Sequence, residues 1–146
     1  MNKFSLDPQL AADCHILGEM GCSLVLLMNN SLAPWFILVP RRPEVELCDL
    51  STEDQLSVLD GVNHLSRFVK SHFKAEKLNV AAIGNVVRQL HIHVVGRNSD
   101  DFCWPGVVWG RKERKPYDAG AVEAIAASLA SWIPVEIYRK IPPPSP

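Results

Sequence analysis

Closely spaced cysteines are missing from this sequence. Its four cysteines are scattered at positions 14, 22, 48 and 103, and no two of them form a CxxC pair. Disulfide-stabilised secreted domains and structural zinc knuckles both need such clusters. We therefore expect reduced thiols, with neither a disulfide framework nor a structural zinc site.

The chain also has little net charge and no long apolar run. Its formal net charge is −1, which excludes the overall basic field typical of dedicated nucleic-acid-binding proteins. No apolar stretch approaches the ~18 residues needed to span a bilayer, and residues 1–8 lack the apolar core of a signal peptide. The expectation is a soluble cytoplasmic protein with no membrane partner.

One basic run interrupts the even distribution of charge. Arg111, Lys112, Arg114 and Lys115 are separated only by Glu113. Runs of this kind are most often solvated loops, and that is our interpretation here, with contact to phosphate groups as the alternative.

Length and apolar content predict one domain. The chain has 146 residues, of which 47% are hydrophobic, and this is enough for a single buried core. We place the domain at residues 1–140. The proline-rich tail, residues 141–146, is expected to be extended and mobile because proline cannot donate a backbone hydrogen bond.

Three segments carry helix signals. Asp7-Pro8 predicts a short helix to about residue 13, and Asp118 is expected to cap an alanine-rich helix over 119–132. Between them, Ser51 followed by two acidic residues predicts a long helix to about residue 72. The stripe of that helix expected to face the core is Leu56, Leu59, Val62, Leu65, Val69 and Phe73.

About five segments carry strand signals, because they are short, apolar and bounded by turn residues. They are residues 15–18, 23–28, 35–39, 77–83 and 86–95, with Gly21 in the turn between the first two. The chain is thus expected to combine about five strands with two principal helices.

The last of these strands carries the most informative pattern in the chain. Gln89, His91 and His93 alternate with Leu90, Ile92 and Val94, so one face of the strand is polar and the other is apolar. Three interpretations are open. The histidines can simply fill a wet strand face, or they can form a metal site completed by His15, Cys103 or a distant acidic residue. They can also provide a nucleophile with a neighbouring donor.

The segment Gly84-Asn85-Val86-Val87-Arg88-Gln89-Leu90-His91-Ile92-His93-Val94-Val95-Gly96-Arg97 resembles the signature of the histidine triad (HIT) superfamily. Residues 26–43 resemble the strand, turn and strand that bind the nucleoside in this superfamily, and Trp104-Pro105-Gly106 is similar to a later family segment. The resemblance covers roughly residues 15–110. It favours an α+β fold with a five-stranded, mostly antiparallel sheet and two main helices. It also implies a homodimer, with residues 104–110 in the contact.

The resemblance implies a nucleotide hydrolase or transferase that cleaves at the α-phosphate of a nucleotide conjugate. His91 falls on the position of the nucleophile that forms a nucleotidyl-histidine, and His93 on that of the third family histidine. The partner is then a small-molecule nucleotide, and no cofactor or metal is needed. Residues expected to contact the substrate are Asn29 or Asn30, Asn85 and Trp104, the last with Trp109 nearby.

Two positions depart from the family pattern. Gln89 stands where the first family histidine is expected, and Phe36 stands near the place of an additional supporting histidine. Gln89 is still expected to take a catalytic part, as a donor to the phosphate oxygens beside His93 and Asn85, but a glutamine amide cannot transfer a proton as an imidazolium does. The alternative function is therefore a nucleotide-binding module with little or no catalysis.

Overall fold

The chain folds around one antiparallel sheet, and the computed structural model describes residues 3–142 of it. The strands are ordered β4-β5-β3-β2-β1-β6. They span Cys14–Met20 (β1), Ser23–Met28 (β2), Trp35–Pro40 (β3), Lys77–Ala81 (β4), Ile92–Arg97 (β5) and Tyr138–Lys140 (β6). The α+β class and the antiparallel sheet are confirmed, but the described residues form six strands rather than the five predicted.

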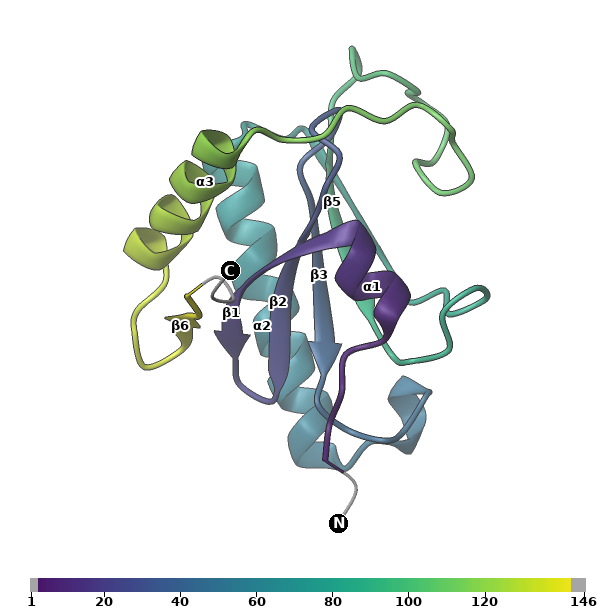
Figure 1. Cartoon of the computed structure of the whole chain (residues 1–146), viewed down its shortest axis with the longest axis vertical. Helices are drawn as coiled ribbons and strands as arrows, with labels where there is room; N and C mark the ends of the chain where they lie inside the picture. The colour runs from purple at the N-terminus through teal and green to yellow at the C-terminus, as the bar shows by residue number, and fades with distance from the viewer. Residues whose placement is uncertain (1–2, 143–146) are drawn as a thin grey trace.

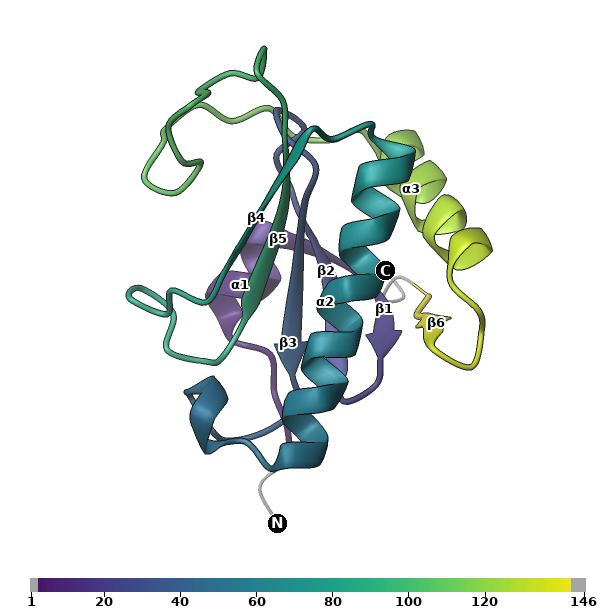
Figure 2. The same cartoon turned by 180° about the vertical axis from the view of Figure 1, so that it is seen from behind.

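Helices cover both faces of the sheet, as the two opposite views show (Figures 1 and 2). The long helix α2 (Thr52–His72) crosses one face, with α3 (Ala119–Trp132) beside it, and the short α1 (Pro8–Asp13) lies over the other face. A short 3-10 turn, η1 (Leu47–Asp49), precedes α2. Among the described residues, no helix combines the length and the apolar character that crossing a membrane requires.

The predicted caps begin all three helices. The side chain of Asp7 accepts from the backbone N–H of Gln9, Ser51 from that of Asp54, and Asp118 from that of Ala121. Each bond satisfies an N–H group that the first helical turn cannot pair internally. This is why three local sequence signals located the helix starts correctly.

The buried stripe of α2 differs from the predicted one. Leu56 and Leu59 are 61% and 55% exposed, while Val58, Gly61, Leu65, Phe68 and Val69 face the sheet. The helix approaches the sheet closely at Gly61, where an added Cβ would lie 3.0 Å from a methyl group of Leu38. The close approach at a residue without a side chain sets the rotation of the helix.

The predicted strand 86–95 is shorter than expected. Residues 86–91 are irregular, and β5 begins only at Ile92. The overlooked strand β6 has three residues and pairs with β1 near Gly18, where the Tyr138 hydroxyl donates to the carbonyl of Leu17 at 3.1 Å. The N–H of Ile141 bonds to the same carbonyl at 3.0 Å, and residues 143–146 of the expected mobile tail lie outside the described residues.

Candidate active site

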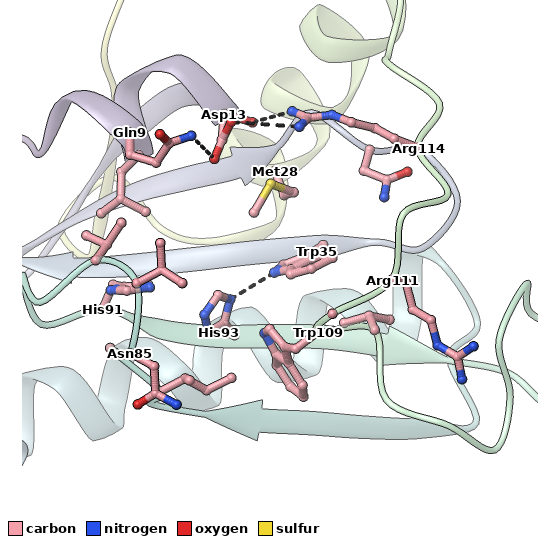
Figure 3. A pocket seen from close by; sticks show the side chains of 18 of the residues that line it. Gln9, Asp13, Met28, Trp35, Asn85, His91, His93, Trp109, Arg111 and Arg114 are labelled. Carbon is pink, nitrogen blue, oxygen red and sulfur yellow. Dashed lines mark hydrogen bonds and ion pairs between the residues drawn. The ribbon is translucent and has the colours of Figure 1, made fainter.

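Two histidines lie side by side at the start of β5, and both are nearly buried. His91 is 7% exposed and immediately precedes the strand, while His93 is 5% exposed and pairs with Ile37 of β3 and Ala81 of β4. Their ring centroids are 4.9 Å apart. The rings lie together because the backbone carries both side chains to the sheet face that α1 covers (Figure 3).

The hydrogen bond of His91 determines which of its nitrogens is free. Its Nδ1 lies 2.7 Å from the backbone carbonyl oxygen of Gln89. A carbonyl oxygen can only accept, so Nδ1 carries the proton and donates it. In the neutral ring the lone pair is then on Nε2, which is the state that a nucleophilic imidazole requires.

His93 is held in the opposite arrangement. The indole Nε1–H of Trp35 donates to its Nδ1 at 2.9 Å, between buried side chains. An indole N–H can only donate, so Nδ1 of His93 accepts and its Nε2 carries the proton. Burial, together with the neighbouring His91 ring, lowers the pKa of His93 to about 4, and the ring is therefore neutral at pH 7.

Both rings line a cleft of about 440 Å³, a volume within the range of small-molecule sites. Gln9, Leu10 and Asp13 of α1 form one wall, and residues 83–87 form another. Trp35 and Trp109 lie beside His93, with the Trp109 and His93 ring centroids 5.3 Å apart. The cleft thus combines aromatic walls with two imidazoles of complementary hydrogen-bonding character.

The basic run lies along this cleft rather than in a detached loop. Arg111, Lys112 and Arg114 line it together with Glu113, and Arg114 pairs with Asp13 at 3.7 Å. In Figure 3 the Arg111 side chain lies toward the end of the cleft away from His91. Of the two interpretations of the run, contact with anionic groups of a ligand is the one that this placement favours.

The two asparagines proposed to bind a ribose are occupied by the protein itself. The side chain of Asn30 lines the cleft but donates to the carbonyl of Glu113 and accepts from the N–H groups of Leu32 and Lys115. Asn29 does not line the cleft, and its side-chain oxygen accepts from the N–H of Tyr117 at 3.0 Å. Both side chains therefore attach the segment 113–117 to the end of β2.

Of the other two residues proposed to contact the substrate, one lines the cleft and the other does not. Asn85 follows Gly84 in the irregular loop and lines the cleft. Trp104 does not; it is 38% exposed and lies against the guanidinium of the buried Arg97, 5.6 Å from its ring centroid. The tryptophan that reaches the cleft is Trp109, which the sequence pattern could not distinguish from Trp104.

Gln89 points away from both histidines and contacts the N-terminal segment. Its amide Nε2 donates to the carbonyl of Ser5 and its Oε1 accepts from the N–H of Asp7, each at 2.9 Å. It does not line the cleft. The expected polar face of Gln89, His91 and His93 is therefore split, because regular alternation holds only from residue 92 onward.

Phe36 is also placed differently from the prediction. It is fully buried on the α2 side of the sheet, where it packs against Phe68 and Phe73. The side chain that β3 directs toward the histidines is the preceding residue, Trp35, because neighbouring residues of a strand face opposite ways. Trp35 is the site residue that sequence reasoning missed.

The metal interpretation finds no geometric support in residues 3–142. No group of three or more histidine, cysteine or acidic side chains there is placed to hold an ion. A protein zinc site needs at least three such ligands, and His91 and His93 supply only two.

Comparison with known proteins gives consistent matches. Residues 9–100 match the family model described as the HIT domain. The structure is similar to that of a histidine triad protein of Marinobacter aquaeolei VT8, with 41% sequence identity, a TM-score of 0.86, and coverage of 90% of this chain and 96% of that chain. A histidine triad protein of Bradyrhizobium japonicum is 37% identical, with a TM-score of 0.86 and coverage of 90% and 99%.

A more distant match concerns the fold alone. The diadenosine triphosphate hydrolase of Plasmodium falciparum, in complex with cyclomarin A, is 17% identical, with a TM-score of 0.61 and coverage of 90% of this chain and 84% of that chain. The match shows that a nucleotide hydrolase is built on the same arrangement of sheet and helices.

Proposed function

The chain belongs to the HIT domain family, and on this premise we propose that it cleaves nucleotide conjugates at the α-phosphate, with His91 as the nucleophile. The single observation that carries the proposal is the hydrogen bond from Nδ1 of His91 to the Gln89 carbonyl. It leaves the Nε2 lone pair unprotonated in a ring that lines a ligand-sized cleft.

The proposed reaction has two steps. In the first, Nε2 of His91 forms a bond to phosphorus while the bond from phosphorus to the leaving group breaks, and the leaving group takes that electron pair. The imidazole then carries a positive charge, which the Nδ1–H bond to the Gln89 carbonyl stabilises. In the second, a water oxygen bonds to phosphorus and gives up a proton to solvent, the electrons of the N–P bond return to Nε2, and a nucleoside monophosphate is released.

His93 is suited to stabilise the phosphoryl oxygens. Its Nε2–H is the ring position that Trp35 leaves free, and donors already in place at developing negative charge are typically the largest contribution to catalysis. Asn85 and the cations of residues 111–114 line the same cleft and supply further candidates for binding the anionic substrate.

Turnover of small conjugates tests the proposal. The wild-type protein is incubated with adenosine 5′-phosphoramidate and with diadenosine polyphosphates, beside His91→Ala and, as a matched control, His64→Ala, a histidine of α2 that does not line the cleft. We expect turnover by wild type and His64→Ala, loss of turnover in His91→Ala, and a covalent nucleotidyl adduct in the intact mass of wild type alone. Turnover that survives His91→Ala eliminates the proposed nucleophile.

A nucleotide-binding module without efficient catalysis is the second candidate. It is favoured by Gln89, whose side chain is occupied by Ser5 and Asp7 and offers the cleft no proton donor. Calorimetric titration with nucleoside monophosphates decides between the two. Binding without turnover of any conjugate selects the module.

A homodimer and a cytoplasmic location complete the proposal. The homodimer is carried over from the resemblance to the family, and the cytoplasmic location is the expectation from the sequence. Nucleotides are the proposed small-molecule partners. Neither a membrane nor a nucleic acid is proposed as a partner.

A further inference from the structure

We propose that Trp35 is a positioning residue: its indole N–H fixes His93 as a neutral ring that donates only from Nε2, so that His93 binds phosphoryl oxygen without protonating the leaving group. This inference rests on the proposed function and deepens it, because it specifies which leaving groups the site accepts.

Strand pairing fixes the position of Trp35 at the centre of the sheet. It lies on β3, which is paired with β2 on one side and β5 on the other. The register pairs Trp35 with Val95 and Ile37 with His93, so Trp35 and His93 are diagonal neighbours on one face. Trp35 is 8% exposed and its N–H lies 2.9 Å from Nδ1 of His93. A long aromatic side chain reaches its diagonal neighbour with little freedom to move.

The chemistry of this pair excludes the usual acid role of a histidine. A histidine acts as a general acid when it is doubly protonated, because only the imidazolium gives up a proton readily near neutral pH. To reach that state His93 would have to gain a proton at Nδ1, where it would then face the N–H of Trp35. The hydrogen bond between Trp35 and His93 would be lost, and two buried N–H groups would face each other without an acceptor.

The groups around His93 do not compensate for the loss of this hydrogen bond when the ring is protonated. The titratable group beside it is His91, whose ring is 4.9 Å away, and the other ring against it is Trp109. The charged residues that line the cleft are Asp13, Arg111, Lys112, Glu113 and Arg114, and none of them hydrogen-bonds to either histidine. Burial and His91 both lower the pKa of His93.

The consequence concerns the leaving group. When the bond to phosphorus breaks, the leaving group departs with the electron pair and takes any proton it needs from solvent rather than from His93. Groups that are stable as anions, such as a phosphate, are then expelled readily, while an amine is expelled slowly. The site thus favours conjugates in which a second phosphate or an acidic hydroxyl compound is released.

Nitrogen-15 NMR of the histidine rings tests the inference without any substrate. In the wild-type protein at pH 7, we expect His93, assigned with a His93→Gln variant, to show a protonated Nε2 and an unprotonated Nδ1. In Trp35→Phe we expect both nitrogens to move toward tautomeric averaging. The pKa of His93 should rise, because its Nδ1 can then take up a proton without facing an N–H group, while burial and His91 continue to lower it. Trp132→Phe and Trp109→Phe, which keep the Trp35 N–H, should leave the His93 tautomer unchanged. A wild-type His93 protonated at Nδ1, or an unchanged spectrum in Trp35→Phe, overturns the proposal.

Kinetics supply the second test. A series of adenosine 5′-phosphate aryl esters with phenols of decreasing pKa should be cleaved increasingly fast by wild type. In Trp35→Phe we expect kcat to fall on the order of tenfold to a hundredfold, as for a misplaced catalytic group, with KM nearly unchanged and with no such effect in Trp132→Phe. Rates independent of the phenol pKa in wild type contradict the inference. If no ester is cleaved at all, the proposed function fails, while the NMR result still judges the role of Trp35.

Discussion

The Nδ1 atoms of His91 and His93 have opposite hydrogen-bond partners. A backbone carbonyl accepts from His91, whereas an indole N–H donates to His93. The first bond leaves a lone pair on the outer nitrogen, and the second leaves a proton there. One hydrogen bond to each ring thereby gives the two histidines separate proposed roles, His91 as nucleophile and His93 as hydrogen-bond donor.

The buried neutral state of His93 predicts a pH-dependent stability. Its pKa is lowered from 6.5 to about 4 in the folded chain, so the unfolded chain binds a proton at a higher pH than the folded chain does. The contribution to the free energy of unfolding is constant above about pH 6.5, decreases as the pH falls toward 4, and changes no further below that. Its full size is on the order of 3 kcal/mol.

Urea unfolding at several pH values between 7 and 4.5 measures this effect. The difference between wild type and His93→Gln isolates it from carboxylates that titrate in the same range. We expect His93→Gln to lose less stability on acidification than wild type and than the control His72→Gln, which replaces an exposed histidine of α2. Parallel losses in all three proteins would show that His93 takes up a proton as easily when folded as when unfolded.

Gln89 predicts a different loss, confined to the N-terminal segment. Its side chain makes two bonds to the backbone of Ser5 and Asp7, and Asp7 caps the helix that walls the cleft. Gln89→Ala should lower the free energy of unfolding by about 1–3 kcal/mol and speed amide hydrogen exchange at Asp7 and Gln9. The neighbouring exposed Arg88→Ala should do neither. Unchanged exchange in Gln89→Ala would mean that the segment is held by other contacts.

At the scale of elements, the segment 110–115 shows how turns and strands build the cleft. The asparagine turn after β2 holds this segment by side-chain bonds from Asn30 to residues 113 and 115. The loop between β5 and this segment is held by Arg97, which is 1% exposed. Its guanidinium donates to the side chains of Asp101 and Asn79 and to the carbonyl of Gly106. Basic side chains are thereby presented along the cleft between two fixed points, Gly106 and residues 113–115.

This arrangement predicts that the cations take part in substrate binding. Arg111→Gln and Lys112→Gln should each raise KM about twofold to fivefold, since one exposed charge contact contributes roughly 0.2–1 kcal/mol, and should weaken the dependence of KM on salt. Lys70→Gln on α2 serves as the control of equal charge. If both cleft variants behave as Lys70→Gln does, the segment is only a solvated loop.

At the scale of the whole molecule, the sheet leaves β4 and β6 as its edges, and several large apolar side chains are exposed. Val107, in the segment predicted to lie in a dimer contact, is 53% exposed, and Val135, after α3, is 69% exposed. A single exposed apolar residue needs no explanation, so these two valines are a matched pair for testing the predicted homodimer.

Light scattering coupled to size exclusion gives the oligomeric state. We expect a mass near 32 kDa, twice the 16.2 kDa of one chain, for wild type and Val135→Asp. Val107→Asp should shift the mass toward that of one chain, because a charge buried without a partner opposes association. A wild-type mass of 16 kDa only, at all concentrations, would contradict the dimer.

The features predicted correctly are those that depend on residues close together in the sequence. The helix starts at residues 8, 52 and 119 follow from caps that bond within three residues of themselves, and such bonds can be inferred from neighbouring letters in the sequence. The strands at residues 23–28 and 35–40 follow from apolar runs bounded by turns. The histidine pair follows from its spacing, because His93 lies on β5 and His91 immediately precedes that strand, so both side chains reach the same face.

Contacts between distant residues determined the rest. Trp35 meets His93 across 58 positions, Gln89 meets Asp7 across 82, and Asn29 meets Tyr117 across 88. Each contact depends on the register of the strands or on the path of a loop. A shift of one residue in that register or path would bring different side chains together. The sequence by itself indicated the family and the two histidines, while only tertiary packing decided which nitrogen of His93 carries a proton. The partner that sets this proton is Trp35, which lies 58 positions away in the chain and meets His93 only through the register of β3 and β5.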